Sequence, residues 1–544
     1  MAEETTKVYS YHTFILPFTW NMYGVTSDKE YEALKRVFED NPQWENTNLK
    51  DANDISSNLE IGSLDEALGY YKQYQYYYPY VRKSFLGYED GICSNYLLKG
   101  ARNKGTYQII KDDKHYVLNI NAIRVRLVNT GVGLFIMECE NHGKDGKGEN
   151  QTGIETVKNI NDYGRRITLP FINNKTNISA DKLIVDIPNV QTVEDDFKGF
   201  IEKVYEKKEY SPNDTSLEHT CDFIKKILSF GSEYRFTSKQ VEKEKEICMK
   251  PALDDRMYVA FAVSDEAWIN SVKFDSASKH YNFETEDALR KSIYEIAYAD
   301  SSGSCTCPDE VMCLDLINKA LYKRWIPWGS LYTITPMGTG MVSSAAIGGE
   351  MNFLYENFIS CYLQMLYIAI VQKASIVKFN RETADIAKHF AANGRKLKRD
   401  DIRNIMNLQE RHAAFDSQLL FSEVSSEQQA IEMYDMLKET LLLDAEEEKL
   451  NESLTSLYEI TDTDLNISVN TIVEILTYVS IILAIASFAY NFVFASEVIV
   501  IDRAIENTAF NFNPHDFFMW LSLLLVFVLS VFIGIRAKWR NRRK

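Results

Sequence analysis

Two adjacent arginines have the residue type and spacing that best fit ligand chemistry. Arg165 and Arg166 follow Tyr163-Gly164 in a chain where Asp and Glu outnumber Lys and Arg by 77 to 60. Guanidinium groups are planar and hold phosphate oxygens through paired N–H donors. After a tight Tyr-Gly turn, the two side chains could clamp one phosphate group. The alternative is a pair of structural ion pairs.

Two aromatic segments offer ring faces for a nucleobase. The run KRWIPW contains Arg324, Trp325 and Trp328, which could stack on a base or belong to a core. The tract Tyr70 to Tyr80 (YYKQYQYYYPY) is either a stacking surface or an amphipathic element with half-buried rings. The sequence leaves both pairs of alternatives open.

The cysteines and histidines form no recognisable catalytic or metal motif. Cys305, Cys307 and Cys313 are close in sequence, but they lack a nearby histidine and a C-x2-C pair, which disfavours a zinc site. No helical histidine pair, nucleophile elbow or complete P-loop is present. We therefore expect no enzyme activity and no covalent cofactor. The acidic composition permits divalent cation binding, and Mg²⁺ is the candidate ion, but composition does not demonstrate such a site.

The charge balance narrows the choice of partners. The net charge is −17 over 544 residues. Direct nucleic-acid binding is not expected, because phosphate contacts along nucleic acid require clustered Lys and Arg. The polar N-terminus (MAEETTKVYS) has no apolar segment of the kind found in a cleaved signal peptide.

Two uncharged apolar stretches near the C-terminus predict transmembrane helices. Ile475–Phe494 and Phe517–Ile535 each have about twenty residues, enough to cross a hydrocarbon core of about 30 Å. The loop between them is acidic and the tail 537–544 is strongly basic. The positive-inside rule then places both termini in the cytoplasm and the chain in the inner cell membrane as a multi-pass protein.

Small and polar residues recur along one face of the first span. They are spaced by three or four residues, at Glu474, Thr477, Ser480, Ala484, Ser487 and Asn491. One interpretation is a packing seam between membrane helices. The other is a pore lining built by several copies, because the Asn491 amide needs partners or water at membrane depth.

The candidate ligand-binding residues lie among predicted strands and helices whose mixture indicates an α+β (α/β-like) domain. Tyr116–Val128 alternates, with Ile123, Val125 and Leu127 on one face, and forms a hairpin with Leu134–Cys139. Tyr11–Phe18 reads as an edge or terminal strand because of Pro17. Further strands are predicted at Lys182–Ile187, Met257–Val263, Tyr332–Thr335 and Met341–Ala346, and helices at Gly153–Tyr163, Val193–Tyr205, Cys221–Phe230 and Glu286–Ala299.

Helix dominates the chain from residue 350 onward. Asn357–Gln372 is uncharged but shorter than a span, which predicts a buried core helix. The proline-free stretch Thr383–Ile472 predicts a long helical stalk with an acidic lower part. The predicted parts are a cytoplasmic sensor domain (1–349), the stalk (350–470), the first transmembrane helix (471–495), an external loop (496–516), the second transmembrane helix (517–536) and the basic tail (537–544).

This architecture resembles the CorA superfamily. The resemblance implies a homopentameric divalent-cation channel whose first span lines the pore. The signature of that superfamily is Gly-Met-Asn followed by Phe. Here the matching positions read Ala489-Tyr490-Asn491-Phe492, which keeps the asparagine and phenylalanine but neither the glycine nor the methionine.

The N-terminal portion resembles the CorA-like membrane effectors associated with type III CRISPR systems. The matching runs are YHTFILPF at Tyr11–Phe18, TGVG at Thr130–Gly133 and INDYGRRITLPF at Ile160–Phe171. The resemblance implies that a messenger, S-adenosylmethionine joined to AMP, binds the cytoplasmic domain and opens or disrupts the membrane part. It makes Arg165 and Arg166 the candidates to hold the phosphate, with Asn161 and Tyr163 beside them.

Three functions follow from these patterns. The first is a membrane effector or channel in antiviral defence, gated by the nucleotide messenger. The second is a divalent cation (magnesium) transporter, and the third is a membrane-anchored scaffold without a pore. The expected partners are the lipid bilayer, further copies of the chain and a small nucleotide.

Overall fold

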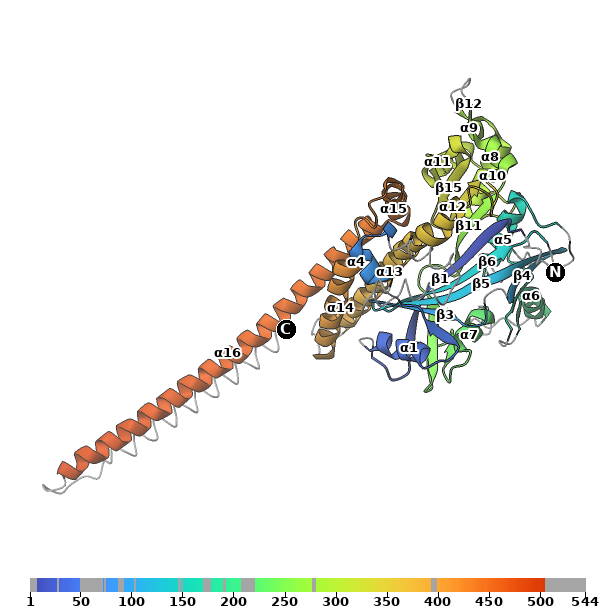
Figure 1. Cartoon of the computed structure of the whole chain (residues 1–544). Helices are drawn as coiled ribbons and strands as arrows, with labels where there is room; N and C mark the ends of the chain where they lie inside the picture. The colour runs from blue at the N-terminus through green and yellow to red at the C-terminus, as the bar shows by residue number, and fades with distance from the viewer. Residues whose placement is uncertain are drawn as a thin grey trace. The chain divides into compact units, whose positions relative to one another are not determined.

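The computed structural model describes residues 7–26, 29–48, 72, 75–86, 92–101, 104–144, 148, 150–169, 178–188, 192–206, 221–275, 280–392 and 399–503 (Figure 1). The chain divides into two compact units. One unit comprises Met1–Ala391 with Arg403–Leu454, and the other comprises Ala392–Ile402 with Thr455–Lys544. Most of the predicted stalk region up to residue 454 therefore belongs to the same unit as the predicted sensor domain.

A mixed β-sheet forms the centre of the first unit. Its main path among the described residues is β14 (Leu321–Tyr322), β15 (Ser330–Ile334), β16 (Gly338–Ser343), β11 (Tyr258–Ser264), β1 (Ser10–Met22), β6 (Val132–Asn141), β5 (Lys114–Val128), β4 (Gly105–Lys111), β7 (Lys182–Asp186) and β8 (Val193–Asp196). Alongside this path, β10 (Glu246–Pro251) pairs with β1 and β9 (Arg235–Thr237), and β3 (Cys93–Leu98) pairs with β5 and β2 (Trp44–Asn46). A separate hairpin joins β12 (Phe274–Asp275) and β13 (His280–Tyr281).

Strand β1 lies inside the sheet, so the prediction of an edge or terminal strand is wrong. On one side it pairs with β6 from Ser10 to Thr19. On the other side β11 pairs with residues 10–15 and β10 pairs with residues 18–22. Pro17 is tolerated because it lies where one partner leaves and the next begins, so no ladder bond requires its missing N–H.

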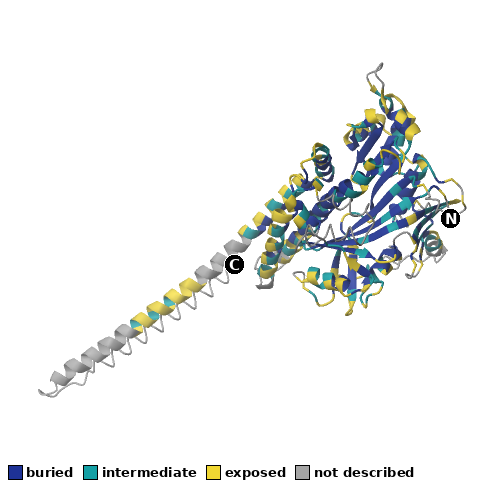
Figure 2. Ribbon diagram, viewed as in Figure 1, coloured by how far each residue is buried: buried dark blue, intermediate teal, exposed yellow. Residues whose placement is uncertain are grey.

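Helices cover both faces of the sheet (Figures 1 and 2). On the first face, α5 (Ile154–Arg165) contacts β1, β4 and β11, and α10 (Asp287–Tyr298) contacts β16 and α5. The same core includes side chains from α1 (Glu30–Glu39), α7 (Asp222–Ser229), α8 (Glu266–Val272), α9 (Asn282–Thr285) and α11 (Glu310–Ala320). Because aliphatic and aromatic side chains from many elements meet there, apolar burial is the main stabilising term.

The second face of the sheet carries α13 (Leu363–Ala392). Ile123, Val125 and Leu127 of β5 face the main core, as their alternation predicts. Arg126 points the other way, where its Nη2 donates to Gln364 Oε1 over 2.9 Å. Thr130 in the β5–β6 turn bonds the Ser375 hydroxyl at 2.8 Å. The predicted hairpin is confirmed, and its two faces hold helices from distant parts of the chain.

One helix among the described residues is long and apolar enough to cross a membrane by length and composition. It is Phe353–His389, which joins α12 (Phe353–Asn357), the π-helical turn η3 (Phe358–Tyr362) and α13. Its most apolar window is 67% buried, and Met365–Gln372 are all buried. The prediction of a buried core helix over Asn357–Gln372 is therefore confirmed.

The chain continues through α14 (Arg399–Gln418), α15 (Gln428–Leu441) and the long α16 (Leu443–Arg503). A shorter apolar helical stretch, Ile472–Ala486, lies within α16, and its large apolar side chains such as Leu483 (64% exposed) are exposed in the single chain (Figure 2). The helix runs past residue 495, so the predicted loop starts too early. ASEVIVI (495–501) contains no glycine or proline to end it. The second predicted span and the basic tail lie outside the described residues.

Most other predicted elements are confirmed, with shifted ends. The strands at Lys182–Ile187 and Met257–Val263 correspond to β7 and β11, and the second hairpin to β15 and β16. The predicted helix Val193–Tyr205 is only partly right. Its first four residues form β8, and α6 (Phe197–Glu206) follows. Asp195 explains the change, because its carboxylate accepts the backbone N–H groups of Asp222 and Phe223 at the start of α7.

Candidate ligand-binding site

Helix α5 carries the residues predicted to bind a ligand, but it places them in different surroundings. Gly164 is helical, and a Cβ there would lie 2.8 Å from both Ile109 Cδ1 and Phe14 Cζ. Glycine thus allows α5 to pack directly on β1 and β4. The helix continues to Arg165. The predicted Tyr-Gly turn is therefore wrong, and the two arginines have different partners.

Arg165 is a buried guanidinium without an ion pair among the described residues. It is 2% exposed. Its Nη1 donates to Met337 O over 3.1 Å, Nη2 lies 3.5 Å from Met337 Sδ, and Nε has no partner in the described part of the chain. Burial, and next the charge of Arg256, lower the pKa of Arg165 to about 10. The group stays charged at neutral pH, and a buried charge without a counter-ion is costly.

Arg166 forms the ion pair of the alternative interpretation. Its Nε donates to Asp162 Oδ1 over 2.8 Å, one helical turn earlier. Asp162 Oδ2 also accepts the backbone N–H of Ser301 over 3.2 Å. This carboxylate therefore joins the end of α5 to the loop after α10. Tyr163 is half-buried and packs against the main core.

Asn161 belongs to a buried polar network. It is fully buried, and its Oδ1 lies 2.8 Å from His12 Nδ1. His12 Nε2 lies 2.9 Å from Ser10 Oγ, which accepts from Asn141 Nδ2 over 3.2 Å. A neutral imidazole with its proton on Nδ1 satisfies all three bonds. The network ties α5 to β1 and leaves the Asn161 Nδ2 donor without a partner in the described part of the chain, so contact of Asn161 with a ligand stays a prediction.

This network predicts a pH dependence of stability. Burial lowers the pKa of His12 to about 4, against an ordinary value of about 6.5 in the unfolded chain. The stabilisation from the neutral ring is complete above pH 6.5 and is lost as pH falls toward 4, by roughly 3 kcal/mol. Thermal unfolding from pH 7.5 to 4.5 should therefore show a steeper loss for the wild type than for His12→Gln. Parallel curves would contradict this role.

A third arginine joins the two predicted ones through tertiary structure. Arg256 lies in the loop between β10 and β11, and its charge acts on Arg165. The backbone N–H of Met257 donates to Arg165 O over 2.9 Å, which fixes the loop against the end of α5. Arg256 itself pairs with Asp254, with Nε 2.9 Å and Nη2 2.7 Å from Oδ2. The three guanidiniums of Arg165, Arg166 and Arg256 are called the arginine cluster below.

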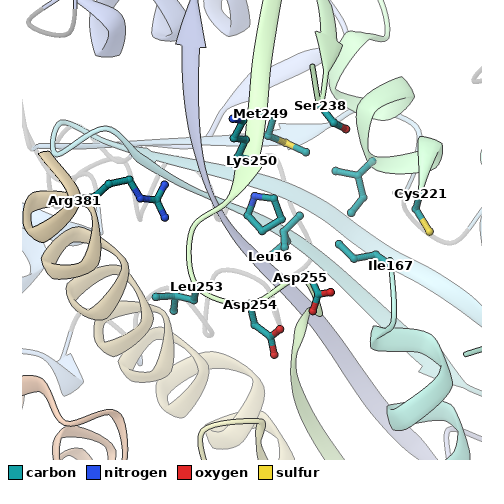
Figure 3. A pocket seen from close by; sticks show the side chains of 12 residues that line it. Leu16, Ile167, Cys221, Ser238, Met249, Lys250, Leu253, Asp254, Asp255 and Arg381 are labelled. Atoms are coloured by element: carbon teal, nitrogen blue, oxygen red, sulfur yellow. The ribbon is translucent and has the colours of Figure 1, made fainter. Parts of the chain in front are cut away.

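A cavity of about 430 Å³ opens beside the same loop (Figure 3). Its apolar lining includes Leu16 of β1, Ile167 after α5 and Met249 of β10. Leu16 lies at the partner change in β1, where neither β11 nor β10 pairs with the strand. The polar lining comprises Lys250, Asp254, Asp255, Arg381, Ser238 and Cys221. The cavity is thus a product of the strand junction and of the loop that leaves it.

The remaining aromatic and thiol candidates contact protein in the described residues. Arg324 Nη1 lies 2.7 Å from Glu432 Oε1, and Trp325 Nε1 donates to Gln429 Oε1 over 2.9 Å, both on α15. The Trp328 ring is 80% exposed. No group of three or more metal-ligating side chains occurs in the described ranges, which include Cys305, Cys307 and Cys313.

The described part of the tyrosine tract packs as an amphipathic element. Tyr77 is 2% exposed, and its hydroxyl donates to Cys361 O. The Tyr80 hydroxyl reaches Glu423 O at 2.8 Å. Helix α4 (Pro79–Phe85) begins within the tract. The half-buried interpretation therefore fits these residues better than a free stacking surface.

The predicted pore-lining residues lie on α16. The hydroxyls of Thr477 and Ser480 donate to the carbonyls of Val473 and Leu476, each four residues earlier. Ser487 and Asn491 lie in the same continuous helix, with Glu474 and Ala484 before them. Both interpretations of this face, a packing seam and a pore lining, stay predictions.

Arg256, Lys250 and Arg381 were missed by sequence reasoning. They lie 84 to 215 positions from Arg166 in a chain with 60 basic residues, and none belongs to a recognisable motif. The local signal available was Asp254-Asp255-Arg256 after Pro251, a charged turn between two apolar strands. Only the pairing of β10 and β11 with the same edge of β1 brings it to α5.

The comparisons with known proteins add little to this picture. No protein-family model matches the chain, and no curated protein matches it either. Among solved structures, the CorA magnesium transporter from Methanocaldococcus jannaschii aligns with 13% sequence identity and a TM-score of 0.20, over 53% of this chain and 94% of that one. A TM-score this low does not establish a common fold, so the functional proposal rests on the residues of this chain.

Proposed function

We propose that the chain is a CorA-like membrane effector whose α/β domain binds a nucleotide messenger and controls a membrane-permeabilising helix bundle. The messenger class is the one implied by the sequence resemblance, S-adenosylmethionine joined to AMP, in type III CRISPR antiviral defence. Several copies of the chain, as in a pentamer, assemble the membrane part. The N-terminal domain and the C-terminal tail are cytoplasmic in this proposal.

The buried, unpaired guanidinium of Arg165 is the observation that carries the proposal. Two further arginines are electrostatically coupled to it, although the chain as a whole is acidic. A buried cation with an unused N–H donor favours an anionic ligand, because the Met337 carbonyl and the charges of Asp162 and Asp254 offset only part of its desolvation. Phosphate suits a guanidinium best, since paired N–H donors match two of its oxygens.

The apolar part of α16 supports the membrane half of the proposal. Large aliphatic side chains are exposed along Ile472–Ala486 in the single chain. Such a surface is unfavourable in water and favourable in a bilayer or between copies of the chain. A ligand can shift the membrane part only by binding its two states with different affinities. The ligand site is therefore expected to contact an element that differs between closed and open forms.

Calorimetry on the detergent-purified full-length chain tests the proposal. We expect binding of S-adenosylmethionine–AMP, with ATP, cyclic oligoadenylate and Mg²⁺ as parallel probes. The double variant Arg165→Gln with Arg166→Gln should weaken that binding at least about tenfold, because two phosphate donors are lost. Arg36→Gln with Arg235→Gln is the matched control, because it removes two charges at exposed arginines outside the predicted site. Unaltered affinity in the double variant would remove the arginine pair from the site.

Divalent cation transport is the second candidate function. The retained Asn491-Phe492 pair and the polar stripe of the first span favour it. Growth of a magnesium-transport-deficient bacterial strain distinguishes the two candidates. Robust rescue without any nucleotide ligand would favour the transporter, whereas absence of rescue together with nucleotide binding favours the effector.

A further inference from the structure

We propose that the cavity at the β1 strand junction is the binding pocket for a nucleoside phosphate, with Lys250 and Arg381 adding to the phosphate contacts expected of the adjoining arginine cluster, and Asp254 and Asp255 holding the sugar hydroxyls or an amino group. This inference rests on the proposed function and locates its ligand. The pocket adjoins the arginine cluster, since Asp254 lines the cavity and pairs with Arg256.

The shape of the cavity fits a small organic ligand. Its volume of about 430 Å³ lies within the range of about 300–1,000 Å³ found for ligand pockets. Leu16 and Ile167 are fully buried and form an apolar floor. A flat base can cover such a floor, while polar groups at the rim fix the orientation of the ligand.

Two cations face this cavity without a protein counter-ion among the described residues. Lys250 comes from β10 and Arg381 from α13; both side chains are exposed, and neither forms an ion pair in the described part of the chain. Figure 3 shows Arg381 extending from its helix toward the strand that carries Lys250. Carboxylates outnumber basic groups in this protein. Two cations from different elements that line one cavity offer an anion a binding position between them.

Asp254 and Asp255 also line the cavity, and their negative charge disfavours a simple anion as the ligand. Asp254 and Asp255 are adjacent, and each carboxyl group affects the pKa of the other. Burial, and next the hydrogen bond with Asp254, raise the pKa of Asp255. For Asp254, burial acts upward, but the hydrogen bonds with Asp255 and Arg256 lower its pKa on balance. The pair offers carboxylate acceptors suited to hydroxyl or amino donors, so a ligand must carry such donors as well as a phosphate.

Arg381 also connects the pocket to helices α13 and α14. The next residue, Glu382, bonds both Lys378 on the same helix and Arg411 on α14. Lys378 lies close to the β5–β6 turn, where a Cβ at Gly131 would be 2.8 Å from its Cε. A phosphate that attracts Arg381 would therefore act on a helix that an ion pair joins to α14 and the Thr130–Ser375 hydrogen bond joins to the sheet. Ligand occupancy is thereby linked to the position of α13.

Calorimetry with charge-reversal variants of the full-length detergent-purified chain tests the pocket. The probes are AMP, S-adenosylmethionine–AMP, adenosine and inorganic phosphate. Lys250→Glu with Arg381→Glu should lower nucleotide affinity by about 100-fold. The matched control, Lys239→Glu with Lys388→Glu, makes the same change in net charge at two exposed lysines and should leave the affinity unchanged. Lys250→Met with Arg381→Met serves if charge reversal prevents folding, which thermal unfolding detects.

Each outcome separates the pocket from the proposed function. Nucleotide binding by the wild type that persists in both Lys250/Arg381 variants would overturn the pocket and leave the messenger-gated effector standing. Absence of nucleotide binding in the wild type would overturn both. Equal affinity for inorganic phosphate and AMP would overturn the nucleoside part, because the apolar floor and the acidic pair would then contribute nothing.

Discussion

Replacing Ser487 and Asn491 together by leucine is expected to abolish ion flux through the membrane part. Both positions belong to the polar stripe of α16, which repeats every three or four residues. Apolar side chains at a narrow point expel water and remove the partners that a hydrated ion requires. Flux is measured as release of an entrapped fluorescent dye or uptake of a cation indicator in proteoliposomes, with the activating ligand present.

The control for this variant lies on the opposite side of the same helix. At 3.6 residues per turn, Ala489 and Val493 lie across from Ser487 and Asn491. Leucine at Ala489 and Val493 adds similar bulk without touching the stripe, and flux should persist. Flux that survives in the double variant at Ser487 and Asn491 would make the stripe a packing seam.

Removing the Glu295 carboxylate is expected to destabilise the α/β domain by about 3–5 kcal/mol. Glu295 of α10 lies 3.0 Å from Lys158 Nζ of α5, and the two side chains are 6% and 1% exposed. The lysine also contacts Glu155 at 2.9 Å and donates to Ser292 Oγ over 2.8 Å, so its three donors are occupied. Glu295→Ala leaves the ammonium group buried without its buried counter-ion.

Two further variants separate the buried ion pair from ordinary surface pairing. Glu155 is 58% exposed, so Glu155→Ala should cost less than about 1 kcal/mol. Lys158→Met combined with Glu295→Leu removes both charges and should recover most of the loss. Chemical unfolding in detergent measures all three. Equal losses of unfolding free energy for Glu155→Ala and Glu295→Ala would show that the buried pair contributes no more to stability than the exposed one.

Local pattern predicted the elements well where one face of a strand or helix is buried. The alternation in Tyr116–Val128 predicts both the hairpin and the direction of Ile123, because successive strand residues point to opposite faces. The uncharged run Asn357–Gln372 is too short for a span and is indeed a core helix. The predicted secondary structure was wrong where packing or pairing with a distant segment outweighed the local conformational preference. Gly164 is helical because α5 packs closely on β1, and residues 193–196 form a strand because they pair with β7.

The sequence by itself determined the class of the molecule: a mixed α/β domain, a long C-terminal helix with an apolar stretch, and an acidic body with a rare pair of adjacent arginines. These features are local, so composition and periodicity carry them. Tertiary structure alone decided which arginine is buried without an ion pair among the described residues and where a cavity opens. Pro17 shows the reason. Its effect depends on two strands, β10 and β11, that lie more than 200 residues away and share one edge of β1. The loop between β10 and β11 brings Arg256 close to Arg165 and lines the pocket. No local sequence pattern predicts this long-range contact.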